Sequence, residues 1–505
     1  MQPSDSTDST FKPTLMLMTG RALAFGFTFF VPAVLARAFT QTEFGTYKQF
    51  MLITYTLFSF GQFGLAECLF YFLPANPERA GRYAFNSVVM LGLMGVLFSS
   101  LLMLNATRVA GWLNNESLAH YAPVAGLYLI FMLMGTVLEI AMITRKHYRL
   151  ATVTYVLSDI LRAVFLVVPA LVLHSLKWTL ISGVLFCMLR VAGLVRYFMS
   201  EFAGATGFDT ALLRQQFVYA VPFFCSVVLH ILQQNYHQYA VSWHVDAATF
   251  AIYAVGCLQI PLVDFLATPA SNVMMVQMGD DLRKGNSARL LSVWRETTRK
   301  LAFVFFPLVV LLMINAYHLI TLLYTTAYAA SVPIFVVFSL SILFSAFQTD
   351  AVLRTFAENR FLLIMNFTRL LGIVLLMTWF FARFDLMGPV ILTVGGILLA
   401  KTMAIVRIKT LLGASYGQVL PWKTLGSLAC VAMLSAVPCV LLNSRLAVHA
   451  MVLLPISGML YLGIFSVLVL SLGLLDAGEK AAIKRTLSAW TRGIVPLARQ
   501  AGIGE

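Results

Sequence analysis

The sequence predicts an all-α polytopic membrane protein with about fourteen transmembrane helices. Of the 505 residues, 60% are hydrophobic and only 11% are charged, whereas charged residues make up about 25% of an ordinary soluble domain. Apolar runs of about 20 residues, long enough to cross a bilayer as helices, recur along the whole chain. A β-barrel is not expected, because its strands are short and alternate between polar and apolar residues.

Charges, glycines and prolines separate the apolar runs from one another. The predicted spans are 14–36, 46–73, 83–105, 122–144, 150–173, 178–199, 218–242, 249–276, 300–323, 332–356, 361–382, 389–411, 423–442 and 450–474. The first span is expected to be retained, because Arg21 interrupts the apolar core that a cleavable signal peptide would need.

The basic residues predict the orientation of the spans. Lys and Arg concentrate in the connections after even-numbered spans, as in Arg145 to Arg149 and Arg283 to Lys300. The positive-inside rule places these connections and both termini in the cytoplasm. The net charge of +14 follows from this bias, so no nucleic-acid partner is expected. The longest connection, about Gln277 to Arg299, is expected to lay its basic segment Ala288 to Arg295 along the inner membrane surface.

A weak internal repeat predicts the domain organisation. Glu43-Phe44-Gly45-Thr46-Tyr47 opens the second span, and Thr249-Phe250-Ala251-Ile252-Tyr253 opens the eighth, six spans later. The predicted parts are a cytoplasmic tail (1–13), a first lobe of six helices (14–199), a cytoplasmic connection (200–217), a second lobe of six helices (218–411), two C-terminal helices (423–474) and a basic cytoplasmic tail (475–505).

Several charges fall inside the spans, where each costs about 2.5 to 3.5 kcal/mol in a bilayer. They are Arg21, Glu67, Asp159, Arg162, Arg190, Asp264, Arg369 and Lys401. Such a set indicates water or a charged ligand inside the protein. Two pairs have a simpler interpretation, because the acid and the cation can neutralise each other on one helix. These are Asp159 with Arg162 and Asp350 with Arg354. Glu139 and Arg354 lie near cytoplasmic ends, where snorkelling is the simpler interpretation.

Four cations without a local acid are candidate ligands of a diphosphate. These are Arg21, Arg190, Arg369 and Lys401. The alternative for each is an ion pair with Glu67 or Asp264 on another helix. The seventh span adds His230, Gln234 and His237 on one helical face, as candidate partners of sugar hydroxyls. Hydrogen bonding between helices is the alternative interpretation.

Three acids are candidate sites for ion coupling, namely Asp264, Asp159 and Glu67. Asp264 is the best of them, because no basic residue lies within a helical turn of it. No metal site is expected, since His230 and His237 are seven residues apart without a local carboxylate or thiol. The six cysteines form no CxxC pair and are interpreted as small apolar residues. No cofactor is predicted.

The first two spans also resemble a known family. Leu35-Ala36-Arg37, the motif Glu43 to Tyr47, Gly61 and Gly64-Leu65 are similar to the opening of the polysaccharide transporter family. These are Wzx-type flippases of the multidrug/oligosaccharidyl-lipid/polysaccharide (MOP) superfamily. The resemblance implies a MATE-like fold of two lobes around a cavity that opens alternately to each side. It also implies an undecaprenyl-diphosphate-linked oligosaccharide as substrate and a bacterial inner membrane location.

The resemblance leaves other function classes to be weighed. A cation-coupled exporter of the related MATE family shares the architecture, and a membrane polysaccharide polymerase or transferase is a third class. Five cations against three acids within the spans favour an anionic lipid-linked substrate, and no catalytic motif stands out. We therefore expect a non-enzymatic flippase for exopolysaccharide or O-antigen synthesis. Its expected partners are the lipid-linked glycan, membrane lipids, and a polysaccharide polymerase with chain-length proteins.

Overall fold

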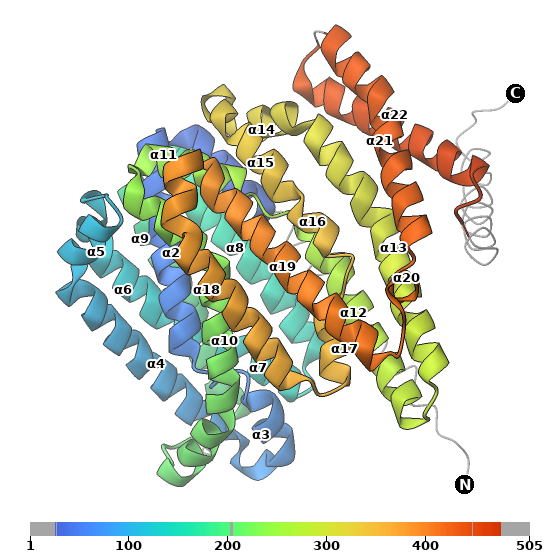
Figure 1. Cartoon of the computed structure of the whole chain (residues 1–505). Helices are drawn as coiled ribbons and strands as arrows, with labels where there is room; N and C mark the ends of the chain where they lie inside the picture. The colour runs from blue at the N-terminus through green and yellow to red at the C-terminus, as the bar shows by residue number, and fades with distance from the viewer. Residues whose placement is uncertain (1–25, 27, 203–205, 447, 476–505) are drawn as a thin grey trace, which may run out of the picture. The chain divides into compact units, whose positions relative to one another are not determined.

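The computed structural model describes residues 26, 28–202, 206–446 and 448–475 (Figure 1). Within these residues every regular element is a helix, and no strand is present. The all-α fold predicted from composition is therefore confirmed. Arg21 and both predicted tails lie outside the described residues.

A helix Thr28–Ala38 comes first in the described chain. The following elements, up to His244, are α2 (Gln41–Gln62), α3 (Leu69–Ala75), the 3₁₀ helix η1 (Pro77–Arg79), α4 (Ala80–Leu104), α5 (Ala106–Trp112), α6 (Ser117–Gly135), α7 (Val137–Thr144), α8 (Tyr148–Leu173), α9 (Leu176–Glu201) and α10 (Thr210–His244). The later elements are α11 (Ala247–Gly256), α12 (Pro261–Arg283), α13 (Ser287–Ile314), α14 (Ala316–Tyr324), η2 (Thr326–Ser331), α15 (Val332–Ser339), α16 (Ser341–Phe344), α17 (Thr349–Thr355), α18 (Asn359–Phe384), α19 (Met387–Leu411), α20 (Tyr416–Val419), α21 (Trp422–Arg445) and α22 (Ala450–Ser471).

Each predicted span overlaps a helix of the described residues. In the described chain, ten helical segments are long and apolar enough to cross a membrane. An eleventh arises if α11 and α12 together form one span. The remaining three predicted spans overlap the helix Thr28–Ala38, α2 and α10. The protein is therefore a multi-pass helical membrane protein.

Two predicted connections are much shorter than expected. The stretch from Gln277 to Arg299 is reduced to residues 284–286, because α12 continues to Arg283 and α13 begins at Ser287. The connection predicted at 200–217 is shortened in the same way, since α9 ends at Glu201 and α10 begins at Thr210. Hydropathy detects only the apolar part of a helix, and the hydrogen-bonded backbone continues past it into polar residues.

The basic segment Ala288 to Arg295 is the first part of α13 and not a separate surface helix. Its Trp294 is fully buried, and the indole Nε1 donates to the carbonyl oxygen of Val419 at 2.8 Å. A buried Trp normally satisfies its N–H in this way. The Trp294 side chain is therefore packed inside the protein, and the position of the segment along the inner membrane surface stays a prediction.

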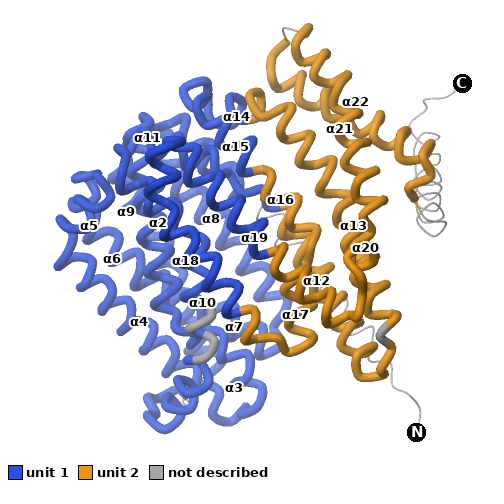
Figure 2. Tube along the Cα trace, in the orientation of Figure 1, with its two compact units in different colours: residues 1–261, 320–338, 363–400 blue, residues 262–319, 339–362, 401–505 orange. Residues whose placement is uncertain are grey.

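The chain divides into two compact units (Figure 2). Unit 1 consists of residues 1–261, 320–338 and 363–400, and unit 2 of residues 262–319, 339–362 and 401–505. Within unit 1, α2 packs against α11, α4 against α6, and α9 against both α6 and α8. Within unit 2, α21 packs against α13 and α22. The two lobes of six helices remain a prediction.

Local backbone features repeat along the chain. Left-handed non-glycine residues recur at a spacing of 211 positions, in the pairs Asn114 and Thr325, Lys146 and Ala357, and His174 and Asp385. Asn105 and Asn315 each follow a helix, and each donates from Nδ2 to the carbonyl oxygen four residues earlier. The two halves of the sequence therefore share these local backbone features.

The repeat predicted at the starts of the second and eighth spans has a structural counterpart. Thr40 is the N-cap of α2 and its side chain accepts from the backbone N–H of Glu43. Asp246 is the N-cap of α11 and accepts from the N–H of Thr249. Both caps precede their motif by three residues, which is the usual geometry of an N-cap. This agreement supports the weak match between the two motifs.

Candidate functional site

A buried ion pair joins α7 and α9 within unit 1. Arg190 donates from Nη2 to the two carboxylate oxygens of Glu139, at 2.6 and 2.7 Å. The same nitrogen lies 3.2 Å from the carbonyl oxygen of Gly135, where α6 ends and α7 is about to begin. The Glu139 side chain is 3% exposed and that of Arg190 is 22% exposed. The carboxylate is thus enclosed, while part of the arginine side chain is accessible.

A second ion pair lies within unit 2. Lys401 on α19 donates from Nζ to the carbonyl oxygen of Phe347 at 2.9 Å and to Oγ1 of Thr349 at 3.0 Å. Its third neighbour is Oδ1 of Asp350, at 3.6 Å. Phe347 lies in the break between α16 and α17. The predicted local pair of Asp350 with Arg354 is thus replaced by a pair with Lys401, and the Arg354 side chain is exposed.

The two ion pairs occupy equivalent positions in the repeat. Glu139 and Asp350 are 211 positions apart, and so are Arg190 and Lys401. In both pairs the carboxylate follows a helix break, and the cation also binds a carbonyl oxygen beside that break. Broken helices in membrane proteins need such partners for their freed carbonyls. Each pair therefore holds a broken helix of its own unit.

Glu139 is a partner that sequence reasoning missed. Its position near a helix end suggested snorkelling, but its carboxylate is buried and bound to Arg190. The signal that could have found it is the spacing of 51 positions between acid and cation, which is the same for Asp350 and Lys401.

Asp159 and Arg162 form the local pair that their spacing predicted. Arg162 Nη2 lies 3.0 Å from Oδ1 of Asp159 on the same helix, α8. It also lies 3.4 Å from Oγ1 of Thr28. Asp159 is thereby held by a neighbouring guanidinium.

The polar residues of α10 divide into buried and exposed members. His237 is buried, with Nδ1 2.7 Å from the hydroxyl of Tyr253, and Gln233 donates to the carbonyl oxygen of Asn366 at 2.7 Å. His230 and Gln234 are exposed. The predicted face of His230, Gln234 and His237 is therefore not uniform, because His237 is hydrogen-bonded to a residue of another helix.

Arg369 lies on α18, half-buried, in the same unit as His237. Arg190 and Arg369 belong to unit 1 and Lys401 to unit 2. The contacts described above hold Arg190 and Lys401 each to residues of its own unit. Arg21 lies outside the described residues. A substrate-binding role for these four cations stays a prediction.

The remaining acid candidates differ in their surroundings. Glu67 lies between α2 and α3, and its Oε2 is buried without a hydrogen-bond partner in the described chain. Asp264 lies in the first turn of α12 and is exposed, and no hydrogen bond or ion pair joins it to another described residue. Neither acid pairs with a described cation, which was the structural alternative for both.

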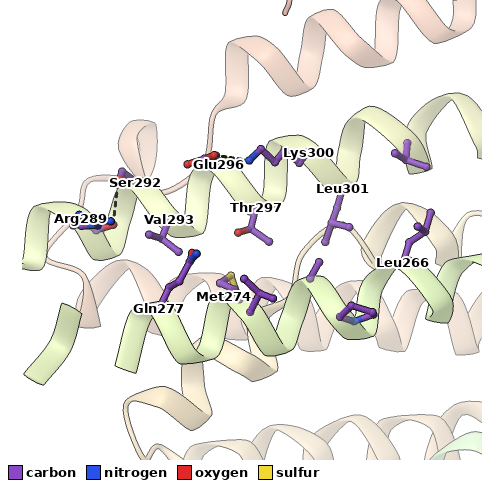
Figure 3. Close-up of a pocket in the computed structure, with 14 residues that line it drawn as sticks. Leu266, Met274, Gln277, Arg289, Ser292, Val293, Glu296, Thr297, Lys300 and Leu301 are labelled. Carbon is purple, nitrogen blue, oxygen red and sulfur yellow. Dashed lines mark hydrogen bonds and ion pairs between the residues drawn. The ribbon is translucent and has the colours of Figure 1, made fainter. Parts of the chain in front are cut away.

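A cavity of about 800 Å³ lies between α12 and α13 within unit 2 (Figure 3). Leu266 lies at one end and Arg289 at the other, and Glu296, Lys300 and Leu301 lie between them. Lys300 pairs with Glu296 at 2.5 Å, and Arg289 pairs with Asp281 at 3.3 Å. Both cations are thus neutralised, and none of the predicted site residues that the structure describes lines this cavity.

The described residues contain no group of three His, Cys, Asp or Glu side chains that could hold a metal ion. Among the described residues, the cysteines at positions 68, 187, 257, 430 and 439 are free thiols.

Comparison with known proteins assigns the family. A model described as polysaccharide biosynthesis protein matches residues 34–333. The chain belongs to this family. No curated protein matches the chain significantly.

Solved structures similar to this member of the family share its fold. The lipid II flippase MurJ, in an inward closed conformation, matches with a TM-score of 0.72 at 12% identity, over 91% of this chain and 99% of that chain. An inward-facing multidrug resistance MATE transporter of the MOP superfamily has a TM-score of 0.56 at 14% identity, over 79% and 96%. A Vibrio cholerae MATE transporter has a TM-score of 0.51 at 15% identity, over 80% and 97%. The chain thus has the fold of MOP flippases and transporters, as the resemblance predicted.

Proposed function

We propose that this protein is a flippase that moves an undecaprenyl-diphosphate-linked oligosaccharide from the cytoplasmic to the periplasmic leaflet of the bacterial inner membrane. The observation that carries the proposal is membership of the polysaccharide biosynthesis family combined with the MOP fold. A structure with this fold is described as a lipid II flippase, which supports a lipid-linked substrate. Alternating access of two lobes is the proposed mechanism.

The cations supply the chemistry that a diphosphate needs. Arg190 is the favoured ligand, because a guanidinium presents several donors and only Nη2 is engaged by Glu139 and Gly135. Lys401 is less suited, since its ammonium already contacts Phe347, Thr349 and Asp350. Arg21 and Arg369 remain candidates, and His230, Gln234 and His237 remain candidates for the sugar.

The product would enter exopolysaccharide or O-antigen synthesis. We propose a polysaccharide polymerase and chain-length proteins as partners, because they would consume the flipped repeat unit. Cytoplasmic termini belong to this proposal and follow from the positive-inside bias.

A cation-coupled exporter of the MATE type is the second candidate. The favouring observation is the match to MATE transporters over about four-fifths of the chain. An exporter would use an exposed intramembrane acid such as Asp264 for coupling. It would carry a free solute and leave lipid-linked intermediates unchanged.

Deletion of the gene in its own host distinguishes the two candidates. For the flippase, surface polysaccharide is lost and complete lipid-linked repeat units build up, and the parent gene restores both. Unchanged polysaccharide with altered sensitivity to organic cations would favour the exporter.

A further inference from the structure

The Glu139–Arg190 pair contains an arginine whose hydrogen-bonding capacity is only partly used. Nη2 makes the contacts to Glu139 and Gly135, whereas Nε is buried and has no hydrogen-bond partner in the described chain. Buried N–H groups without partners are rare in native proteins, and each calls for an explanation. A further anion at this guanidinium is the explanation that its charge and spare donors favour.

Glu139 has the opposite character. Both its oxygens are held by Arg190, and its side chain is 3% exposed. If Arg190 turned to another anion, the carboxylate would keep a buried charge without a partner, which is strongly unfavourable. Taking up one proton removes that charge.

We infer that binding of the substrate's diphosphate to Arg190 is coupled to uptake of one proton by Glu139. This inference rests on the proposed function and names the residue that takes up a proton when the substrate binds. The guanidinium–carboxylate pair breaks, a guanidinium–phosphate pair forms, and one proton from solvent binds a carboxylate oxygen of Glu139. Release of the diphosphate restores the ion pair and returns the proton to solvent.

Other ionisable groups on the helices packed against α7 are possible competitors. Within the spans these include Glu67 and Cys68 before α3, Tyr71 on α3 and Tyr83 on α4. They also include Tyr155, Asp159 and Arg162 on α8, and Cys187, Arg196 and Tyr197 on α9. Asp159 is neutralised by Arg162, at 3.0 Å. Glu67 has a buried oxygen without a described partner, so it is the acid that an experiment must separate from Glu139.

The equivalent pair in unit 2 provides a matched control. The Nζ of Lys401 is already surrounded by three oxygens, and the Asp350 side chain is 51% exposed. Losing its partner would leave the Asp350 carboxylate in contact with water and not buried. The repeat has thus placed a buried acid in one pair and an exposed acid in the other.

The test measures proton uptake by purified full-length protein in lipid nanodiscs, with farnesyl diphosphate as a soluble isoprenyl diphosphate probe. At pH 7.5 in weak buffer, an indicator dye reports protons and radiolabelled probe reports binding. The parent should take up about one proton more per bound probe than Glu139→Gln, which should still bind. Glu67→Gln and Asp350→Asn should behave like the parent, and Arg190→Ala should lose binding at least tenfold.

Several results would overturn the coupling. These are equal proton uptake by the parent and Glu139→Gln, loss of uptake in Glu67→Gln alone, and failure of the parent to bind the probe. If Glu139→Gln does not yield monodisperse protein, calorimetry of the parent in two buffers of different ionisation enthalpy counts the protons without a variant, and a count of zero rejects the inference. A parent that translocates lipid-linked oligosaccharide without proton uptake would refute the coupling and leave the proposed function intact. Absence of translocation would refute the function itself.

Discussion

Gly45 on α2 packs directly against the backbone of Ala247 on α11. A Cβ atom built on Gly45 would lie 1.7 Å from the carbonyl oxygen of Ala247 and 2.5 Å from its carbonyl carbon. Backbone atoms cannot move aside as a flexible side chain does, so only glycine fits here. This close approach joins the second turn of α2 to the first residue of α11, the two helices that the motif repeat identified.

Gly45→Ala is therefore expected to destabilise the protein by about 1–3 kcal/mol, or to prevent folding if the helices cannot separate. Thermal denaturation of purified protein in detergent measures the effect. The control is Gly395→Ala on α19, where a new Cβ meets no atom within 4 Å. Equal melting temperatures for Gly45→Ala and the parent would contradict the packing.

The N-cap of α11 predicts a pH-dependent contribution to stability. Hydrogen bonds from the Thr249 side chain and backbone lower the pKa of Asp246 below its ordinary value of 3.8. Because this pKa is lower in the folded state, the ionised Asp246 stabilises the protein at pH values above the ordinary pKa. This stabilisation is lost as the pH falls through the lowered pKa. Asp246→Ala should cost about 1 kcal/mol at pH 7.

Asp246→Asn separates the charge from the hydrogen bond in this cap. The amide oxygen still accepts, so its cost at pH 7 should be smaller than that of Asp246→Ala. The gap between the parent and Asp246→Asn should narrow below about pH 4. A gap in melting temperature that stays constant from pH 7 to pH 3 would argue against the lowered pKa.

Trp294 should contribute to stability as a buried residue of α13. Trp294→Ala leaves a large cavity and is expected to cost about 3–5 kcal/mol. Trp294→Phe leaves the carbonyl oxygen of Val419 without its donor, at a cost of about 1–3 kcal/mol. Trp178→Phe is the control, because the Trp178 side chain is exposed. Similar denaturation curves for all three variants would indicate that Trp294 is not buried.

The order and type of the helices could be predicted from the sequence because hydropathy is a local property. The extent of α12 and α13 could not, since the charged residues up to Lys284 and from Arg289 to Lys300 interrupt the apolar pattern. The sequence identified the correct partner of an ion pair where both residues share a helix, as in Asp159 and Arg162.

The candidate site required long-range contacts that no local rule supplies. Glu139 and Arg190 are 51 positions apart and meet only because α7 and α9 pack together. The break after Gly135 that exposes a carbonyl oxygen to Arg190 has no proline or charge to mark it. The repeat spacing of 211 would have revealed both ion pairs, but it becomes clear only from backbone geometry.

Orientation in the membrane can be tested at the short turn between α12 and α13. The proposed topology places Lys284 in the cytoplasm, so Lys284→Cys in a cysteine-free variant should resist an impermeant thiol reagent added to intact cells. Permeabilisation should then allow labelling. Labelling of intact cells would place this turn outside and invert the proposed orientation.

Translocation by the purified protein tests the central claim most directly. Full-length protein is reconstituted into liposomes that carry a fluorescent undecaprenyl-diphosphate-linked oligosaccharide, and an impermeant glycosidase is added outside. For a flippase, the protected inner-leaflet fraction should become accessible to the enzyme at a rate far above that of protein-free liposomes, and Arg190→Ala should slow this rate at least tenfold. A protected fraction that stays constant in the presence of folded parent protein would contradict the proposed function.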